Sequence, residues 1–146
     1  MKLQQSTLLG LYAVLELAKA DGEQLSAAAI ADKFDVSINH LAKVLRILVK
    51  AGLLQAARGA GGGYRFSGNS KRTTLMDVIE FFEPVSIEGF EHHGQLHQTD
   101  VEFGLAVALV EISEIMQATL RSITIRTMLK LMERGDMTAR STPQPR

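Results

Sequence analysis

The strongest constraint on the fold is a pair of short helical patterns between residues 26 and 52, separated by a tight turn. Ser26 can cap a helix over 27–34, because a serine hydroxyl accepts a hydrogen bond from the free N–H groups of a first helical turn. Ser37 can cap a second helix that ends before Gly52. This second helix has one apolar stripe, formed by Leu41, Val44, Leu45 and Leu48. Two helices joined in this way predict a helix-turn-helix.

A glycine-rich segment, Arg58-Gly-Ala-Gly-Gly-Gly63, follows between two short extended runs over 53–57 and 64–67. This arrangement predicts a β-hairpin with a flexible tip. A nucleotide-binding loop is the alternative, but the segment lacks a Gly-Lys-Ser/Thr ending, and Tyr64 stands where a dinucleotide motif needs its last glycine. The predicted fold class is therefore mainly α with a small β-hairpin, a winged helix-turn-helix.

The rest of the chain is predicted to be helical around one loop. Apolar spacing indicates a helix over 7–19 with the stripe Leu8, Leu11, Tyr12 and Leu15. Further helices are expected over 75–82, where Thr74 opens the helix, from Asp100, which caps the helix, to Ile123, and from Thr124 until Gly135 ends the last one. We thus expect a winged helix-turn-helix domain over 1–83, a loop over 84–99, two helices over 100–135 and a disordered tail over 136–146.

Composition excludes several classes of protein. With 46% hydrophobic and 22% charged residues, the chain is that of an ordered globular protein. It contains no cysteine, which excludes thiolate nucleophiles, disulfides and thiolate metal clusters. The longest nearly apolar stretch, Phe103 to Val110, is far shorter than the roughly 20 residues of a membrane span, and the N-terminus lacks a signal-like apolar block. We therefore expect a cytoplasmic protein without membrane contact.

Charge is sorted along the sequence although the net charge is zero. Residues 33–72 contain eight basic residues and one acidic residue, whereas residues 73–120 contain nine acidic residues and neither lysine nor arginine. A basic half joined to an acidic half is expected if one part meets a polyanion. Two solvated faces are the simpler alternative.

The polar face of the second predicted helix favours the polyanion. Asn39, Lys43, Arg46 and Lys50 lie opposite its apolar stripe, where asparagine can bind adenine, and lysine or arginine can bind guanine or phosphate. A polar helix face alone is more often merely solvated. The hairpin changes this interpretation, because Arg58 and Arg65 flank glycines that allow close approach to a phosphate backbone or a minor groove. We interpret helix and hairpin as a site for double-stranded DNA.

The long helix predicted from Asp100 carries an apolar seam typical of two packed helices. Left without a partner, this seam would form a larger apolar patch than monomers usually expose, so we expect a homodimer. The predicted interface consists of Leu105, Leu109, Ile112, Met116, Leu120 and Ile123.

Three histidines, His92, His93 and His97, lie in the acidic loop and could bind a divalent metal. A histidine-rich surface loop is the simpler interpretation, because the spacing is not diagnostic of a ligand set. The chain shows no catalytic triad, cofactor loop or suggestive carboxylate pair, and we expect no enzymatic activity.

Five segments resemble the Rrf2 family of bacterial winged-helix transcription regulators, over about residues 1 to 133. They are Met1-Lys-Leu3, Val36-Ser-Ile-Asn-His-Leu41, Ala51-Gly-Leu-Leu54, Arg58-Gly-Ala-Gly-Gly-Gly-Tyr64 and Thr74-Leu-Met-Asp-Val-Ile79. The resemblance implies a homodimer paired through the long helix, with the second helix of the motif in the major groove and Arg58 in the minor groove. Carried over by position, the DNA contacts would be Ser37, Asn39, His40, Lys43, Arg58, Gly59, Gly61 and Gly62.

The chain departs from the family at the sensing loop. Cluster-binding members carry three cysteines in the segment equivalent to about 90–104, and some add an acidic ligand where this chain has Leu8. Without cysteines the usual iron-sulfur cluster cannot form, and no cofactor is expected beyond the possible divalent metal. Ala42 also replaces an acidic residue that discriminates bases in the iron-sulfur regulator.

The sequence thus predicts a homodimeric, sequence-specific transcriptional repressor that answers a regulatory protein or a small-molecule effector. Two alternatives stay open: a protein-interaction module with secondary DNA binding, and a metal-dependent regulator that uses the loop histidines. The many cations of residues 33–72 favour the first prediction.

Overall fold

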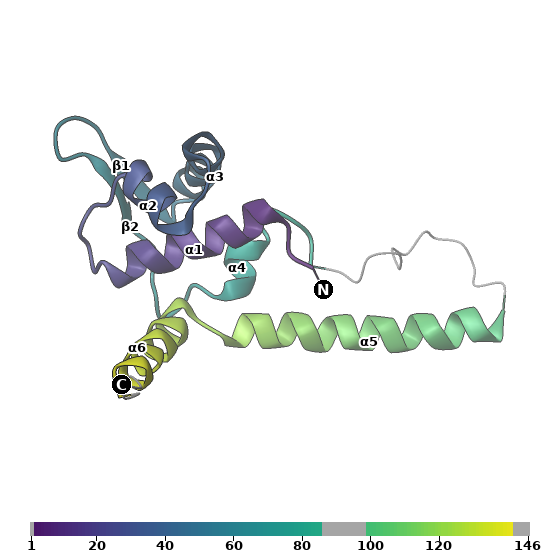
Figure 1. Cartoon of the computed structure of the whole chain (residues 1–146). Coiled ribbons are helices and arrows are strands. Elements are labelled where there is room, and N and C mark those ends of the chain that lie inside the picture. Colours follow the sequence, from purple (N-terminus) through teal and green to yellow (C-terminus); the bar gives the residue numbers. More distant parts are fainter. Residues whose placement is uncertain (1, 86–98, 142–146) are drawn as a thin grey trace.

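The computed structural model describes residues 2–85 and 99–141, with side chains described as far as 136. In these ranges Figure 1 shows α1 to α4 and a hairpin gathered into one body, while α5 extends away from it and α6 lies below α1. The elements are α1 (Gln5–Lys19), α2 (Ala27–Phe34), α3 (Ile38–Lys50), β1 (Leu54–Ala57), β2 (Gly63–Phe66), α4 (Leu75–Ile79), α5 (Asp100–Ser122) and α6 (Ile125–Ser141). The prediction of a mainly α chain with a small hairpin is confirmed.

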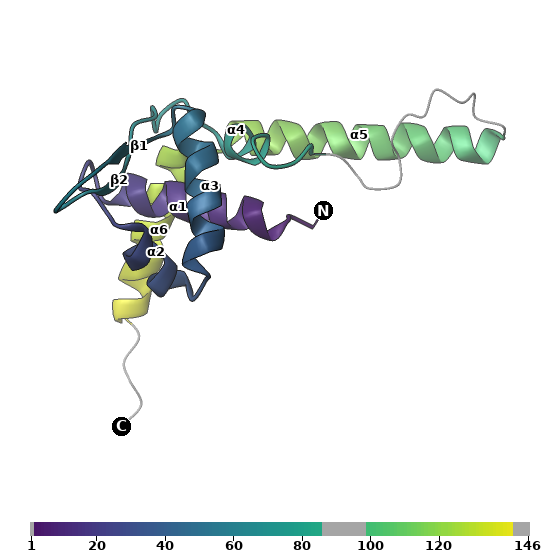
Figure 2. The ribbon, with the colours of Figure 1, turned by 90° about the horizontal axis from the view of Figure 1, so that it is seen from above.

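Helix α1 runs through the middle of the body, and α3, α4, α6 and β2 all pack against it (Figure 2). Its buried residues are Thr7, Leu9, Gly10, Leu11, Ala13, Val14 and Leu17. The expectation that Leu8 and Tyr12 belong to the buried stripe is wrong. Both are exposed, and Tyr12 stacks on Phe34 of α2 with ring centroids 5.1 Å apart. Because α1 has neighbours on several sides, a small residue is needed at Gly10, where a Cβ would lie 2.4 Å from Cε2 of Phe82.

Helices α2 and α3 form the predicted helix-turn-helix. The Ser26 hydroxyl accepts a hydrogen bond from the Ala29 N–H at 3.1 Å, and the Ser37 hydroxyl accepts one from the His40 N–H at 3.4 Å. Asp35 ends α2 with a φ of 50°, in the left-handed region, and so turns the chain between the helices. The predicted stripe of α3 is buried in full: Leu41, Val44, Leu45 and Leu48.

The wing is the antiparallel pair β1 and β2, in which Leu54–Ala57 lies opposite Gly63–Phe66. Leu25 and Tyr64 exchange backbone hydrogen bonds of 2.9 and 2.8 Å, which attach the hairpin to the segment before α2. The base of the wing is therefore fixed, and its tip over residues 58–62 projects from the body (Figure 1).

Helix α4 is shorter than the predicted 75–82. Thr74 caps it as expected, in a reciprocal capping box with Asp77, but the helix ends at Ile79 and a turn covers 80–82. The Phe82 N–H bonds to the Ile79 carbonyl, three residues back rather than four, at 2.9 Å. The chain thus tightens before Pro84, and the predicted last turn of regular helix is lost.

Two further helix ends differ from prediction. Thr99, not Asp100, caps α5, because its hydroxyl accepts a hydrogen bond from the Glu102 N–H at 3.2 Å. Helix α6 continues through Gly135 to Ser141, so neither the predicted end nor a tail beginning at residue 136 is correct. One glycine costs a helix only about 0.5–1 kcal/mol, which does not terminate it. The rest of the predicted tail, residues 142–146, lies outside the described residues.

The junction between α5 and α6 is joined to the start of α4. The Leu75 N–H donates to the Ile123 carbonyl and the Ile125 N–H donates to the Thr73 carbonyl, both at 2.9 Å. Thr74 and Thr124 complete this contact as an isolated β-bridge, and Ile125 is fully buried. The C-terminal end of α5 is therefore anchored in the body.

By length and composition α5 could cross a membrane, with 23 residues and a mean hydropathy of 1.5 over its most apolar window. The sequence analysis considered only a shorter apolar stretch within it. Glu111 and Glu114 lie near the middle of this helix, where an ionised side chain is costly in a bilayer. Only 6% of the window is buried within the chain, so α5 exposes a large apolar surface.

Candidate nucleic-acid interface

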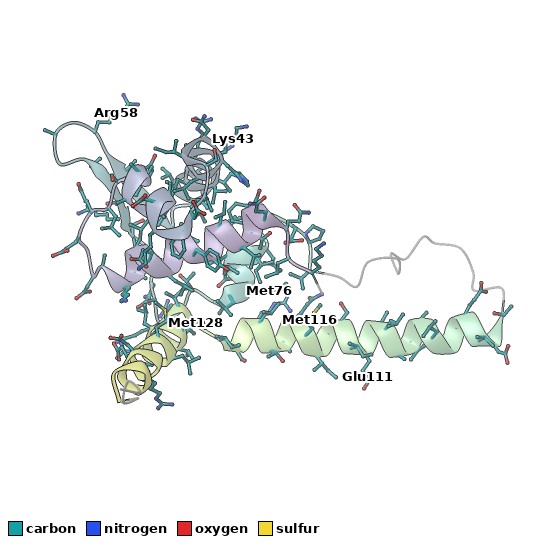
Figure 3. All side chains as sticks on the ribbon, in the orientation of Figure 1. Lys43, Arg58, Met76, Glu111, Met116 and Met128 are labelled. Atoms are coloured by element: carbon teal, nitrogen blue, oxygen red, sulfur yellow. The ribbon has the colours of Figure 1, made fainter. Side chains whose placement is uncertain are left out.

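Four polar side chains lie together on the exposed side of α3. They are Asn39, Lys43, Arg46 and Lys50, and all are exposed. In Figure 3 Lys43 points away from the body, to the same side as Arg58 of the wing. This side is opposite the one from which α5 and α6 extend. Helix and wing thus place their cations together on one surface.

The tip and the base of the wing hold their arginines differently. Arg58 lies exposed at the tip, whose glycines Gly59, Gly61 and Gly62 were predicted to face DNA. The tip is tight, because a Cβ on Gly62 would lie 2.5 Å from the Ala57 carbonyl oxygen. Arg65 on β2 is also exposed, but its guanidinium donates two hydrogen bonds, of 2.9 and 2.6 Å, to Oε1 of Gln55 on β1. This cross-strand pair orients the Arg65 side chain.

Two predicted contact residues have partners inside the protein. Ser37 caps α3, as described above. His40 is half-buried, and its Nε2 lies 3.1 Å from Oγ of Ser6 on α1. Ser37 thus fixes the start of α3, and His40 connects α3 to α1, whatever further contact these side chains make with a ligand.

One contact that supports this surface was missed by the sequence analysis. Glu83, at the start of the loop, accepts hydrogen bonds from the hydroxyl of Thr7 and, at 2.8 Å, from the N–H of Gln4. The carboxylate thus binds one backbone N–H and one hydroxyl group at the start of α1 and fixes the end of α1 that carries Ser6. A separation of 76 residues between Thr7 and Glu83 leaves no local signal in the sequence.

The predicted dimer residues on α5 fall into two groups. Met116 and Leu120 are half-buried against the core of their own chain. Leu109 and Ile123 are half-buried as well, whereas Leu105 and Ile112 are 51% and 53% exposed. A second stripe, the heptad stripe, is exposed along its whole length with alternating spacings of four and three: Val101, Leu105, Ala108, Ile112, Ile115 and Thr119. Both stripes have helical periodicity, so only the packing of α5 on its own body separates them.

The three histidines of the metal hypothesis, His92, His93 and His97, lie outside the described residues. Within residues 2–85 and 99–136, no group of three or more histidine, aspartate or glutamate side chains could hold a metal ion. The metal hypothesis stays a prediction.

A helix-turn-helix with a wing and a cationic face defines a winged-helix DNA-binding protein. Residues 3–131 match the family model Rrf2, described as iron-dependent transcriptional regulator. The chain is 50% identical over 133 residues to the HTH-type transcriptional regulator BadM of Rhodopseudomonas palustris, a match that covers 91% of this chain and 84% of the relative. The chain therefore belongs to the Rrf2 family, whose members are DNA-binding transcriptional regulators and not enzymes. The predicted family and the absence of enzymatic function are confirmed.

Solved structures agree with this assignment. The fold is similar to that of CymR, the global cysteine regulator of B. subtilis, with a TM-score of 0.73 and 25% identity over 90% of this chain and 98% of that one. It is also similar to T. potens IscR, with a TM-score of 0.70 and 24% identity over 99% and 94% of the two chains. The winged-helix architecture is thus established.

The family description implies that iron is bound. The residues of this chain do not fit iron held in a cysteine-ligated cluster. Iron-sulfur clusters are held by cysteine thiolates, and the sequence contains no cysteine. No cysteine-ligated cluster can therefore form.

Proposed function

We propose that two copies of this chain pair through the heptad stripe of α5 and that the dimer represses transcription by occupying an operator. The exposure of the stripe carries the proposal. Val101 is 74% exposed and Ile115 is 61% exposed, although both are large apolar residues. A second α5 in a two-fold arrangement would bury the same residues on both chains, with Ala108 allowing close approach at the centre.

Pairing supports DNA recognition because it supplies two α3 helices. Dimeric helix-turn-helix proteins bind half-sites about 34 Å apart, one helical turn of DNA. Asn39, Lys43, Arg46 and Lys50 would then enter or flank the major groove, with Ser37 and His40 at the start of the helix. Arg58 with Gly59, Gly61 and Gly62 would meet the minor groove, and Arg65 a phosphate.

Repression requires no surface beyond these. A dimer that occupies promoter DNA excludes the polymerase by volume alone, whereas activation needs an additional contact. The cytoplasm is the compartment in which such a protein meets bacterial DNA. The signal that controls this protein is not the loss of a cysteine-ligated cluster. It is a small molecule, a partner protein or a divalent metal.

Replacing Ile112 by Glu tests the pairing. The parent should sediment as a dimer at micromolar concentration, and Ile112→Glu as a folded monomer, because each interface would have to bury unpaired charge. The monomer should lose most of its affinity for an operator with two half-sites in gel-shift titrations. Leu131→Glu is the matched control, since Leu131 on α6 is 50% exposed and lies outside the stripe; it should stay dimeric. A parent that sediments as a monomer would contradict the proposal.

A further inference from the structure

Ile38 is an unusual residue for the place it occupies. It is the first residue of α3, directly after the capping Ser37, and it is 48% exposed. A β-branched residue adds neither a cap nor helix propensity at this position. It stands beside Asn39 at the N-terminal end of the helix, the end that contacts base edges in helix-turn-helix proteins.

Ala42 extends this apolar surface along the helix. Residues four apart on a helix have Cβ atoms about 5–6 Å apart, so Ile38, Ala42 and Arg46 follow one another along one flank. Ala42 is half-buried and small, and Ile38 beside it is 48% exposed. The result is a short apolar flank beside the polar face of α3.

The major groove of DNA offers one apolar group that such an apolar flank can contact. Thymine carries a C5-methyl group there, and alanine and other apolar side chains recognise it by contact. Asn39 is the neighbouring residue, and asparagine pairs with the N6 and N7 atoms of adenine. A helix that presents an apolar side chain and an asparagine at its N-terminal end suits a DNA site with adjacent thymine and adenine.

We propose that Ile38 and Ala42 form a specificity contact with one thymine methyl group in each half-site. This inference rests on the proposed DNA-binding function of α3 and adds to it a base preference that hydrogen bonding alone does not supply. Removing the methyl group should weaken binding about fourfold per half-site, which is about 0.8 kcal/mol.

Deoxyuridine isolates the methyl group, because it differs from thymidine only there. An operator is first selected from random DNA with the full-length chain. Each thymine of a half-site is then replaced singly, and Kd is measured by fluorescence anisotropy at fixed salt. One position should show the fourfold loss with the parent. Ile38→Ala should bind the thymine and uracil forms alike, while Ile38→Val, which keeps a branched side chain, should retain most of the discrimination.

Ile47→Ala is the matched control. Ile47 is also an exposed isoleucine of α3, at 40% exposure, but it lies nine residues on and hence on the opposite flank of the helix. This variant should discriminate between the thymine and uracil forms of the operator as the parent does. An operator without any methyl-sensitive thymine, or an unchanged uracil penalty in Ile38→Ala, overturns the inference while leaving sequence-specific binding intact. A selection that enriches no sequence overturns the proposed function as well.

Discussion

Arg65 and Arg58 carry the same charge, but their side chains are ordered to different degrees in the absence of DNA. The bidentate contact with Gln55 holds the Arg65 guanidinium in one orientation on the wing strand. A side chain ordered before binding loses less entropy when it meets a phosphate. Among the described residues, no hydrogen bond or ion pair holds Arg58 in the same way, so in the proposed complex the DNA itself would have to order this side chain.

Arg65→Ala should weaken binding to every DNA sequence alike and reduce the slope of log K against log salt by about one unit. The physical reason is the loss of one phosphate neutralisation. Anisotropy titrations over a series of salt concentrations measure this slope. Gln55→Ala is the control, since it releases the guanidinium without removing the charge; the slope should be unchanged and the affinity only slightly lower. Sequence-dependent losses in Arg65→Ala would instead indicate base readout.

Helix α1 depends on a contact that comes from outside it. Gln4, which precedes the helix, makes no side-chain cap, and the Glu83 carboxylate, distant in the sequence, accepts hydrogen bonds from the Gln4 N–H and the Thr7 hydroxyl instead. A hydrogen bond to a charged group typically contributes about 1.5–3 kcal/mol. Since Ser6 of α1 contacts His40 of α3, the Glu83 contact also supports α3 indirectly.

Glu83→Gln should therefore lower the free energy of unfolding by about 1.5–3 kcal/mol, as measured by urea denaturation. In the double variant Glu83→Gln/Thr7→Val, the loss of unfolding free energy should be clearly less than the sum of the two single losses, because the partners share one interaction. Glu80→Gln is the control: its carboxylate pairs with Arg121 at 3.6 Å on the surface, and such pairs contribute about 0–1 kcal/mol. Strict additivity would show that Thr7 and Glu83 act independently.

Elements defined by neighbouring residues could be predicted, and those defined by distant contacts could not. Ser26, Ser37 and Thr74 cap their helices as expected, because a cap is settled within three residues. The buried side of α1 was mispredicted at Leu8 and Tyr12, since the positions of its neighbours determine which residues are covered. For the same reason the sequence did not separate the two stripes of α5. Of the candidate site, the cations of α3 were placed correctly on one exposed face, whereas the Gln55 and Glu83 contacts were not foreseen.

At the scale of the whole molecule, the basic half forms the surface of α3 and the wing, and the acidic half leads into α5. Residues 84–99, between the two parts, contain no lysine, arginine or cysteine. Protein prepared under anaerobic, iron-replete conditions should be colourless, and nitric oxide should not change its affinity for DNA, because no cysteine-ligated cluster is present to be lost. Visible spectroscopy and parallel gel shifts check both statements.

Calorimetry with zinc, nickel and iron(II) completes this experiment, with a variant in which His92, His93 and His97 are all replaced by alanine as the control. Binding that the variant loses would assign the signal to a metal. Equal binding by both proteins would leave a small molecule or a partner protein as the signal. A coloured protein with cluster absorption would contradict the argument from composition.

The backbone bonds that tie residues 123–125 to residues 73–75 also determine how α5 can behave as a mechanical part. Held in the body at its C-terminal end and extending away from it, the helix resembles a beam clamped at one end, so its angle to the surface of α3 and the wing is set at that end (Figure 1). Two such beams joined together would act as a ruler between the recognition helices. One base pair inserted between half-sites turns them by about 35° and separates them by about 3.4 Å. A ruler built in this way makes the spacing between half-sites part of what the dimer recognises.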